Sequence, residues 1–288
     1  PPRHGLVCLL HEKPYAGVNG SGKHDNWSLT TNLGENLLDP GDTPNENLQF
    51  LLVLSCIMKA VDVHADLLRQ SASCVGNEHR LGAQEAPPAI ISIFLGDQLD
   101  SVVDQIVSNA DSVQLLATTK LYSGVSTVPL IKKDATDRNR TSPFAFTGNK
   151  FEFRMVGSSD SIADANTTLN AIVAEAMCEA ADVLEKADDF NAACFKLIHD
   201  MLKKLLADHR RIIFNGNGYS DAWVEEAARR GLPNLPSMVN AIPALTTEKA
   251  ENLFTKFNIY TKSELEARAE IMYETYAKVL KIETQTMI

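Results

Sequence analysis

The sequence lacks any apolar stretch long enough to cross a membrane. Its longest apolar run, near residues 51–57, is soon followed by Lys59 and Asp62, whereas a transmembrane helix needs about 20 apolar residues. No signal peptide is recognisable at the start. From these absences we expect no membrane partner and a cytoplasmic location.

Cysteine and positive charge are also scarce. The five cysteines are widely spaced and form no C-x-x-C pair, a pattern typical of reduced thiols. Lys and Arg number 27 against 37 Asp and Glu, a net charge of −10. Because a general nucleic-acid binder is usually basic, this balance argues against a nucleic-acid partner. The remaining composition, 44% apolar and 22% charged, is that of an ordinary globular protein.

Hydrophobic patterns divide the chain into a mixed part and a helical part. Strands are predicted at residues 6–12, 89–95 and 150–156, and a long buried helix at 46–71. Asp97 is the predicted N-cap of the helix after the second strand. Beyond residue 160 the pattern indicates two long helices within 162–210, short helices at 220–230 and 247–257, and a longer one from about 262. We therefore predict a mixed α/β region, 1–160, and a helical region, 161–288.

The segment GVNGSGKH, residues 17–24, differs by one residue from the phosphate-binding P-loop, G-x-x-x-x-G-K-[ST]. His24 stands where Ser or Thr would bind Mg²⁺. The residues that follow are rich in Asn, Gly and Pro and are unsuited to open a helix. A P-loop is therefore not predicted, which leaves a glycine turn with an incidental histidine as the default interpretation of this segment alone.

Three further segments carry charged residues that could bind a substrate or a phosphate, and each also has an explanation without a functional role. RLGAQEAPP places Arg80 and Glu85 in a loop where paired prolines exclude a helix interior. DRNRTSPF includes Arg140, whose guanidinium fork suits phosphate or carboxylate. KFEFRMV alternates, so Glu152 and Arg154 share the face opposite two phenylalanines. Taken alone, the first segment is better explained by a solvated loop, and the second equally well by a surface ion-pair loop. For the third, a strand face exposed to water is the commoner case.

Taken together and in order, N-G-S-G-x-H, R-L-x(3)-E-A-P, R-N-R and F-E-F-R resemble glutamine synthetase. The wording HEKPYAGVNGSGKHDNWSL, RLGAQEAPPAI and DRNRTSPFAFTGNKFEFRMVGSS is similar to the class III (GlnN-type) branch, and the resemblance covers essentially the whole chain. It implies an α/β (α+β) catalytic domain of the glutamine synthetase/guanido kinase-like fold, with a curved antiparallel sheet backed by helices. It also implies that ATP phosphorylates glutamate and that ammonia then displaces the phosphate.

The resemblance implies roles for eleven residues, each at its place in a motif. The ligands of a divalent cation, Mg²⁺ or Mn²⁺, would be His24 and Glu152. The substrate glutamate would be bound by Asn19, Gly20, Arg80, Arg154 and Glu85, the last also closing over the acyl phosphate and helping to deprotonate ammonium. ATP would be held by Asn26, Trp27, Ser28 and Arg140.

The sequence also departs from the family pattern. The spacing from Arg80 to Glu85 is one residue shorter than usual, Asn26 replaces a histidine found in many relatives, and Ala145 replaces a further arginine. We expect the chain to be a catalytic-domain fragment whose β-grasp domain and other metal carboxylates lie upstream, and to be inactive alone. The parent is expected to form a homo-oligomer of stacked rings with active sites shared between subunits. Two alternatives are a γ-glutamyl-polyamine ligase and a non-catalytic structural or regulatory relative on the same fold.

Overall fold

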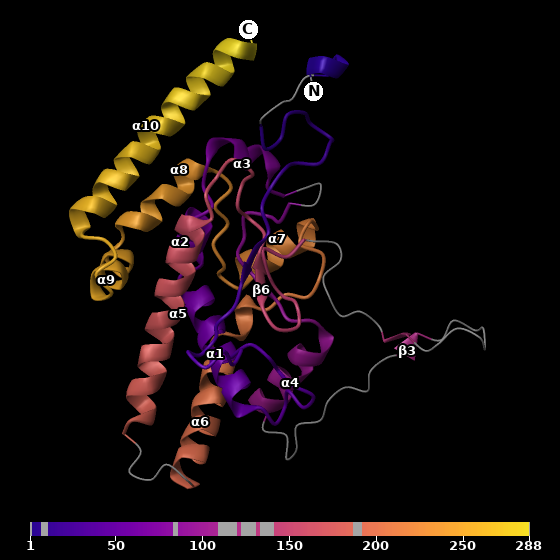
Figure 1. Ribbon diagram of the computed structural model, residues 1–288, viewed down its shortest axis with the longest axis vertical. Helices are drawn as coiled ribbons and strands as arrows, with labels where there is room; N and C mark the ends of the chain where they lie inside the picture. Colours follow the sequence, from indigo (N-terminus) through magenta and orange to yellow (C-terminus); the bar gives the residue numbers. More distant parts are fainter. Residues whose placement is uncertain are drawn as a thin grey trace.

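A small four-stranded sheet forms the centre of the mixed part of the chain (Figure 1). The computed structural model describes residues 2–6, 11–82, 86–108, 120–121, 131–132, 141–186 and 192–287. The strand order is β1-β6-β5-β2, with β6 antiparallel to both of its neighbours and β2 parallel to β5. The strands are β1 (Asp25–Trp27), β2 (Ile93–Phe94), β5 (Phe144–Phe146) and β6 (Phe151–Phe153), and a separate two-stranded sheet pairs β3 (Lys120–Leu121) with β4 (Ile131–Lys132).

Aromatic residues hold the central strands together. Phe144 and Phe151 stack with their ring centroids 4.5 Å apart, and Phe153 meets Phe144 edge-on. All three side chains are fully buried. Offset and edge-on aromatic pairs add stabilisation beyond the area they bury, so one face of β6 belongs firmly to the core, as the alternation of KFEFRMV predicts.

Helix α1 (Leu48–Val63) is the centre of the helical layer. It begins at Asn47, whose side chain accepts a hydrogen bond from the backbone N–H of Phe50, the usual way to satisfy a free amide at a helix start. Most of α1 is buried, because α5 (Ala163–Leu184) and α6 (Ala192–Asp208) pack against it (Figure 1). A helix apolar on nearly all sides needs such cover.

The chain beyond residue 160 is helical, as predicted, and no strand occurs among its described residues. Helix α10 (Lys262–Met287) contacts α3 (Val75–Arg80), α8 (Met238–Ala241), α9 (Glu248–Lys256) and the 3₁₀ helix Ile242–Thr246 (Figure 1). No described helix is both long and apolar enough to cross a bilayer. The other described helices are α2 (Ala65–Gln70), α4 (Asp97–Val107) and α7 (Asp221–Arg229), with further 3₁₀ turns at Pro2–His4 and Arg210–Ile212.

Several local predictions need correction. The apolar run 89–95 forms only a two-residue strand, because later loops satisfy its backbone: the N–H of Phe214 binds the carbonyl of Ile93, and that of Leu235 binds the carbonyl of Ala89. Gly96, with φ of 79°, is the N-cap of α4, and Asp97 is its first helical residue. The β2–β5 pair is parallel, so the sheet is not wholly antiparallel. Of the strand predicted at 6–12, residues 11 and 12 are bends, and residues 7–10 lie outside the described part.

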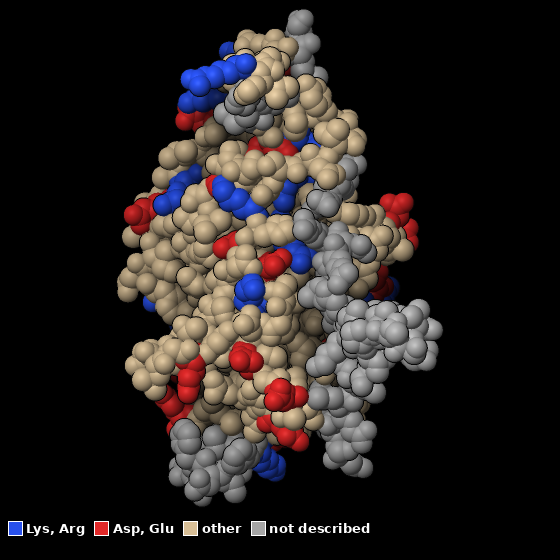
Figure 2. Space-filling model, turned by 45° about the vertical axis from the view of Figure 1, so that its right-hand side comes forward, with Lys and Arg blue, Asp and Glu red and all other residues tan. Residues whose placement is uncertain are grey.

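Lys and Arg form no continuous patch on the face drawn in Figure 2. Among the residues described there, most Lys and Arg lie in the upper half with Asp and Glu among them, and the lower part carries mainly Asp and Glu. A nucleic-acid binder concentrates Lys and Arg on one face. This face therefore has no continuous basic surface, in keeping with the net charge of −10.

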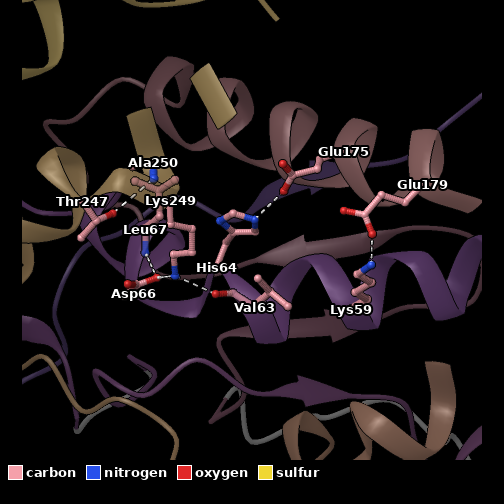
Figure 3. Close-up of polar contacts among 10 residues, drawn as sticks. All are labelled: Lys59, Val63, His64, Asp66, Leu67, Glu175, Glu179, Thr247, Lys249 and Ala250. Carbon is pink, nitrogen blue, oxygen red and sulfur yellow. Dashed lines mark hydrogen bonds and ion pairs between the residues drawn. The ribbon is translucent and has the colours of Figure 1, made fainter. Parts of the chain in front are cut away.

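His64 interrupts the single helix predicted at 46–71 and stands at the junction of α1 and α2 (Figure 3). Its imidazole is buried, and Nε2 lies 2.8 Å from Glu175 Oε2 on α5. Its Nδ1 has no hydrogen-bond partner among the described residues. Burial lowers the pKa of His64, and the bond to Glu175 offsets only part of that effect. A proton on Nδ1 would be a buried donor without an acceptor.

We expect this histidine to make folding sensitive to mild acid. Unfolded, His64 takes up a proton near its ordinary pKa of about 6.5; folded, it resists protonation. The unfolded state thus binds more protons, and the free energy of unfolding falls as pH drops below that value. Urea unfolding at pH 7 and pH 5 should show a larger loss for the unaltered chain than for His64→Gln. His4→Gln, at an exposed histidine, should keep the original pH dependence. Identical losses in all three proteins would contradict this assignment.

Candidate active site

Two antiparallel strands place several of the predicted site residues on one face of the sheet. Asn26 on β1 is directly opposite Glu152 on β6, and residues directly opposite each other in a sheet project to the same side. The flanking pairs, Asp25 with Phe153 and Trp27 with Phe151, project to the other side. The core takes the second face, so the first is the one available for chemistry.

His24, Glu152 and Arg154 meet at this face. The Oε2 atom of Glu152 lies 3.7 Å from Nδ1 of His24 and accepts a hydrogen bond of 3.1 Å from Nε of Arg154. The side chains of His24 and Glu152 are one third and one fifth exposed, whereas Arg154 is buried. The structure therefore brings together the two predicted metal ligands and one predicted glutamate-binding arginine. The strand face that carries these two residues was expected to be exposed to water, which is true of Glu152 in part and not of Arg154.

Arg80 lies behind this cluster and not in the loop predicted from RLGAQEAPP. It is the last residue of α3 and is buried. Its guanidinium donates to Asn77 Oδ1 at 2.8 Å and to the carbonyls of Met155 and Arg154 at 3.1 and 2.9 Å. Burial lowers its pKa, opposed by the nearby carboxylate of Glu12. A guanidinium has five N–H donors, so these three bonds do not exhaust it.

Two glycines of the motif N-G-S-G-x-H pack flat against Arg80. A Cβ at Gly20 would lie 2.7 Å from Cγ of Arg80, and one at Gly22 would overlap its guanidinium. Gly22 also forms a β-bridge with Gly157. The role predicted for Gly20 was close approach of the backbone to glutamate. The observed close approach is to the arginine side chain, and contact with glutamate stays a prediction.

Glu12 belongs to this region and sequence reasoning missed it. Its carboxylate is buried and accepts hydrogen bonds from the backbone N–H, at 3.0 Å, and the hydroxyl of Ser159. Burial pushes the pKa of Glu12 upward, but the bonds from Ser159 outweigh that effect and the pKa is lowered. The carbonyl of Glu12 binds the N–H of Ser21. The sequence did offer a signal for Glu12: it stands beside Lys13 in HEKP, just before the glycine-rich segment.

The other predicted site residues that the structure describes are exposed, hydrogen-bonded to a backbone carbonyl or buried in the core. Asn19 is exposed and Asn26 donates to the carbonyl of His24. Ser28 donates to Asn36 and to the carbonyl of Asn149. Trp27 is a core residue whose indole N–H binds Asn170 at 2.9 Å, so its predicted contact with ATP would have to come from the backbone. Glu85 and Arg140 lie outside the described residues.

The His24–Glu152 pair fits part of a site for a divalent cation. An imidazole nitrogen and a carboxylate oxygen 3.7 Å apart lie close enough to bind one ion. Within the described ranges no group of three or more His, Cys, Asp or Glu side chains forms a metal site. Mg²⁺ typically uses one or two carboxylates plus water and substrate phosphates, so two protein donors suit an ion shared with a nucleotide.

The P-loop interpretation can be discarded on the structure. Residues 25–27, directly after His24, form strand β1 and not the helix that a P-loop requires. The glycines of GVNGSGKH pack on Arg80 and bridge to Gly157. His24 therefore reaches Glu152 from the start of a strand.

Comparison with known proteins points to one family. The model of the glutamine synthetase C-terminal domain matches residues 197–288. The chain is 52% identical over 288 residues to the type-3 glutamine synthetase of Dictyostelium discoideum, covering 99% of this chain and 38% of that protein. It is 46% identical to a glutamine synthetase of Butyrivibrio fibrisolvens and 42% identical to one of Bacteroides fragilis (strain YCH46), covering 99% of this chain and 40% and 39% of those proteins.

The chain belongs to the glutamine synthetase family. Within the family it is similar along nearly its whole length to a type-3 member, in agreement with the class III wording of its motifs. The chain spans about two fifths of the length of these relatives, between 38% and 40%.

We expect the contact between Gly22 and Arg80 to limit what position 22 can hold. Gly22→Ala forces the buried guanidinium to move, and overpacking of this kind costs about 1–3 kcal/mol. The free energy of unfolding, measured in urea, should fall by that amount. Ser21→Ala, at an exposed neighbour, should leave it unchanged. If the clash is with Arg80, the cost of Gly22→Ala shrinks in an Arg80→Ala background; an undiminished cost would place the clash elsewhere.

Proposed function

We propose that this chain forms the catalytic core of an ATP-dependent glutamate–ammonia ligase, which makes L-glutamine, ADP and phosphate through γ-glutamyl phosphate. The observation that supports it most directly is the meeting of His24, Glu152 and Arg154, residues from two separate motifs. In the proposed division, residues 1–160 carry the incomplete catalytic core and residues 161–288 the helical part behind it.

The residues of this chain would divide the work by position. Arg154, beside the Glu152 carboxylate, would hold glutamate near the phosphoryl group in transfer, and Arg80 would hold a substrate carboxylate or fix the loop that does. Arg140 would lie near the γ-phosphate of ATP, and Glu85 would cover the acyl phosphate, keep water out and accept a proton from ammonium. Preorganised charges of this kind act most strongly where water is excluded.

The cofactor and partners follow from the same proposal. His24 and Glu152 would bind Mg²⁺ or Mn²⁺, which when present neutralises phosphate charge. ATP would extend along residues 26–28, and Asn19 and Gly20 would border the glutamate site. The full-length protein would assemble as a homo-oligomer of stacked rings, with each active site completed by a neighbouring subunit.

The activity is tested on the full-length protein that contains this chain. Incubation with ATP, glutamate, ammonium and Mg²⁺ should yield glutamine and phosphate in equal amounts. Arg154→Gln should lower kcat by about 100-fold, the usual cost of losing one donor to developing charge. Arg229→Gln, at an exposed arginine on α7, should leave the rate unchanged. Faster product formation with putrescine or ethanolamine than with ammonium would overturn ammonium as the acceptor, and no product with any acceptor would overturn the proposed activity.

The metal ligands can be tested without turnover. Mn²⁺ binding, followed by electron paramagnetic resonance in the presence of ATP, should weaken at least tenfold in His24→Ala and in Glu152→Gln, because each removes one protein donor. Glu35→Gln, at an exposed glutamate, is the matched control and should bind Mn²⁺ as the unaltered protein does. Unchanged Mn²⁺ affinity in both site variants would show that the ion binds elsewhere.

A further inference from the structure

A cavity of about 630 Å³ lies along the inner side of α10, apart from the cluster of His24 and Glu152. Its lining residues come from α2, α5, α8, α9 and α10, from the 3₁₀ helix Ile242–Thr246 and from the loops that join them. Small-molecule sites typically enclose about 300–1,000 Å³. The cavity shares Cys74, Asp160, Met238 and Thr275 with a smaller hollow of about 230 Å³ that Glu12 also lines. Its size is therefore sufficient for a small organic molecule.

One end of the cavity is apolar. Leu245 and Phe254 are buried there, and Met272 and Ile271 of α10 close the side. Tyr260 adds an aromatic ring, against which the guanidinium of Arg268 stacks at 4.2 Å. Sites for small molecules are typically apolar with a few polar groups that fix orientation. This end would accept an aliphatic or aromatic body.

The other end contains a carboxylate whose hydrogen bonding is incomplete. Oδ2 of Asp160 is buried and has no hydrogen-bond partner among the described residues. The thiol beside it, Cys74, is a weak donor. The ammonium of Lys23 binds the backbone carbonyls of Ser158, at 2.7 Å, and of Asp160. A buried polar atom without a partner costs stability. A cationic donor from a ligand would therefore supply the hydrogen bond that Oδ2 of Asp160 does not receive from the described residues.

The neighbouring charges make Asp160, more than Asp164, the residue that a ligand would bind. Asp164 lies in the first turn of α5, where the helix dipole already stabilises a negative charge. Burial raises the pKa of Asp160, and the negative charges of Glu12 and Asp164 add to the rise, while Cys74 and Lys23 oppose it. A carboxylate held in such surroundings gains from an adjacent positive charge.

We propose that this cavity binds a small primary amine carried on an apolar body, with the ammonium at Asp160 and the body between Phe254 and α10. Quaternary amines fit less well, because the orphan oxygen needs an N–H donor. Anions are disfavoured by Asp160, Asp164 and Glu264, which outnumber Arg268 among the charged residues that line the cavity. The residues that line this cavity include none of those proposed for glutamine synthesis.

Phenethylamine, which is protonated at pH 7, is a suitable test ligand, and 2-phenylethanol is its neutral counterpart of similar shape. Isothermal titration of the 288-residue chain should detect phenethylamine at millimolar concentration or below and 2-phenylethanol at least tenfold more weakly. Asp160→Asn should reduce the affinity for the amine by about tenfold or more, because a hydrogen bond to a charged group is lost. Asp221→Asn, at an exposed first-turn aspartate of α7, should bind as the unaltered chain does.

A second variant keeps the test decisive if Asp160→Asn fails to fold. Ala267 lines the cavity from the exposed side of α10, so Ala267→Leu should fill space at the cavity and weaken the amine without disturbing the core. Equal affinity for amine and alcohol would overturn the role of Asp160. No binding by the unaltered chain, or full binding by Ala267→Leu, would overturn the site.

Discussion

The burial of one guanidinium constrains the whole region of the candidate active site. Arg80 is charged, buried and hydrogen-bonded to two carbonyls of the segment that leaves β6. A buried charge is tolerated only where polar groups surround it, so the end of β6, the tip of α3 and the loop before β1 must converge there. Gly20 and Gly22 allow this convergence, because a Cβ at Gly20 would meet the aliphatic part of the Arg80 side chain and one at Gly22 would overlap its guanidinium. The positions of His24 and Glu152 depend on the same packing, since His24 follows the loop before β1 and Glu152 lies on β6, two residues before Arg154.

The order of the motifs along the chain predicted which distant residues lie together, and local hydrophobic patterns did not. Alternation in KFEFRMV correctly predicts Phe151 and Phe153 in the core, because period-two burial is a local property. The same alternation places Arg154 toward water, where it is not: its side chain is buried against Glu152. The contact of His24 with Glu152 spans 128 residues of sequence, and no local pattern predicts it. Only the resemblance, which ranks both residues as ligands of one ion, indicated that they would lie together.

The errors in secondary structure also have physical reasons. The helix predicted at 46–71 has unbroken apolar periodicity, but His64 leaves the helical conformation, with φ of −113°, and its imidazole contacts Glu175, a long-range contact that periodicity cannot predict. Paired prolines correctly exclude a helix interior after Arg80, yet Arg80 itself still ends α3. The helices beyond residue 160 are well predicted because their periodicity extends over several turns. The cavity beside Asp160 was not predicted, because its lining residues come from five α-helices and a 3₁₀ helix, none of which carries a recognisable motif.

The candidate active site and the α10 cavity meet in four consecutive residues. Gly157 bridges to Gly22, Ser158 and Asp160 hold Lys23 through their carbonyls, and Ser159 binds Glu12. The Asp160 side chain reaches the cavity from the same turn, closed by the hydrogen bond from its N–H to the carbonyl of Gly157. So short a turn has few ways to absorb a shift of Asp160 without moving Gly157 or Ser159. Gly22 and Glu12 both lie next to Arg80. A shift of Asp160 would therefore displace the surroundings of the Arg80 guanidinium, on which the packing of the candidate active site depends.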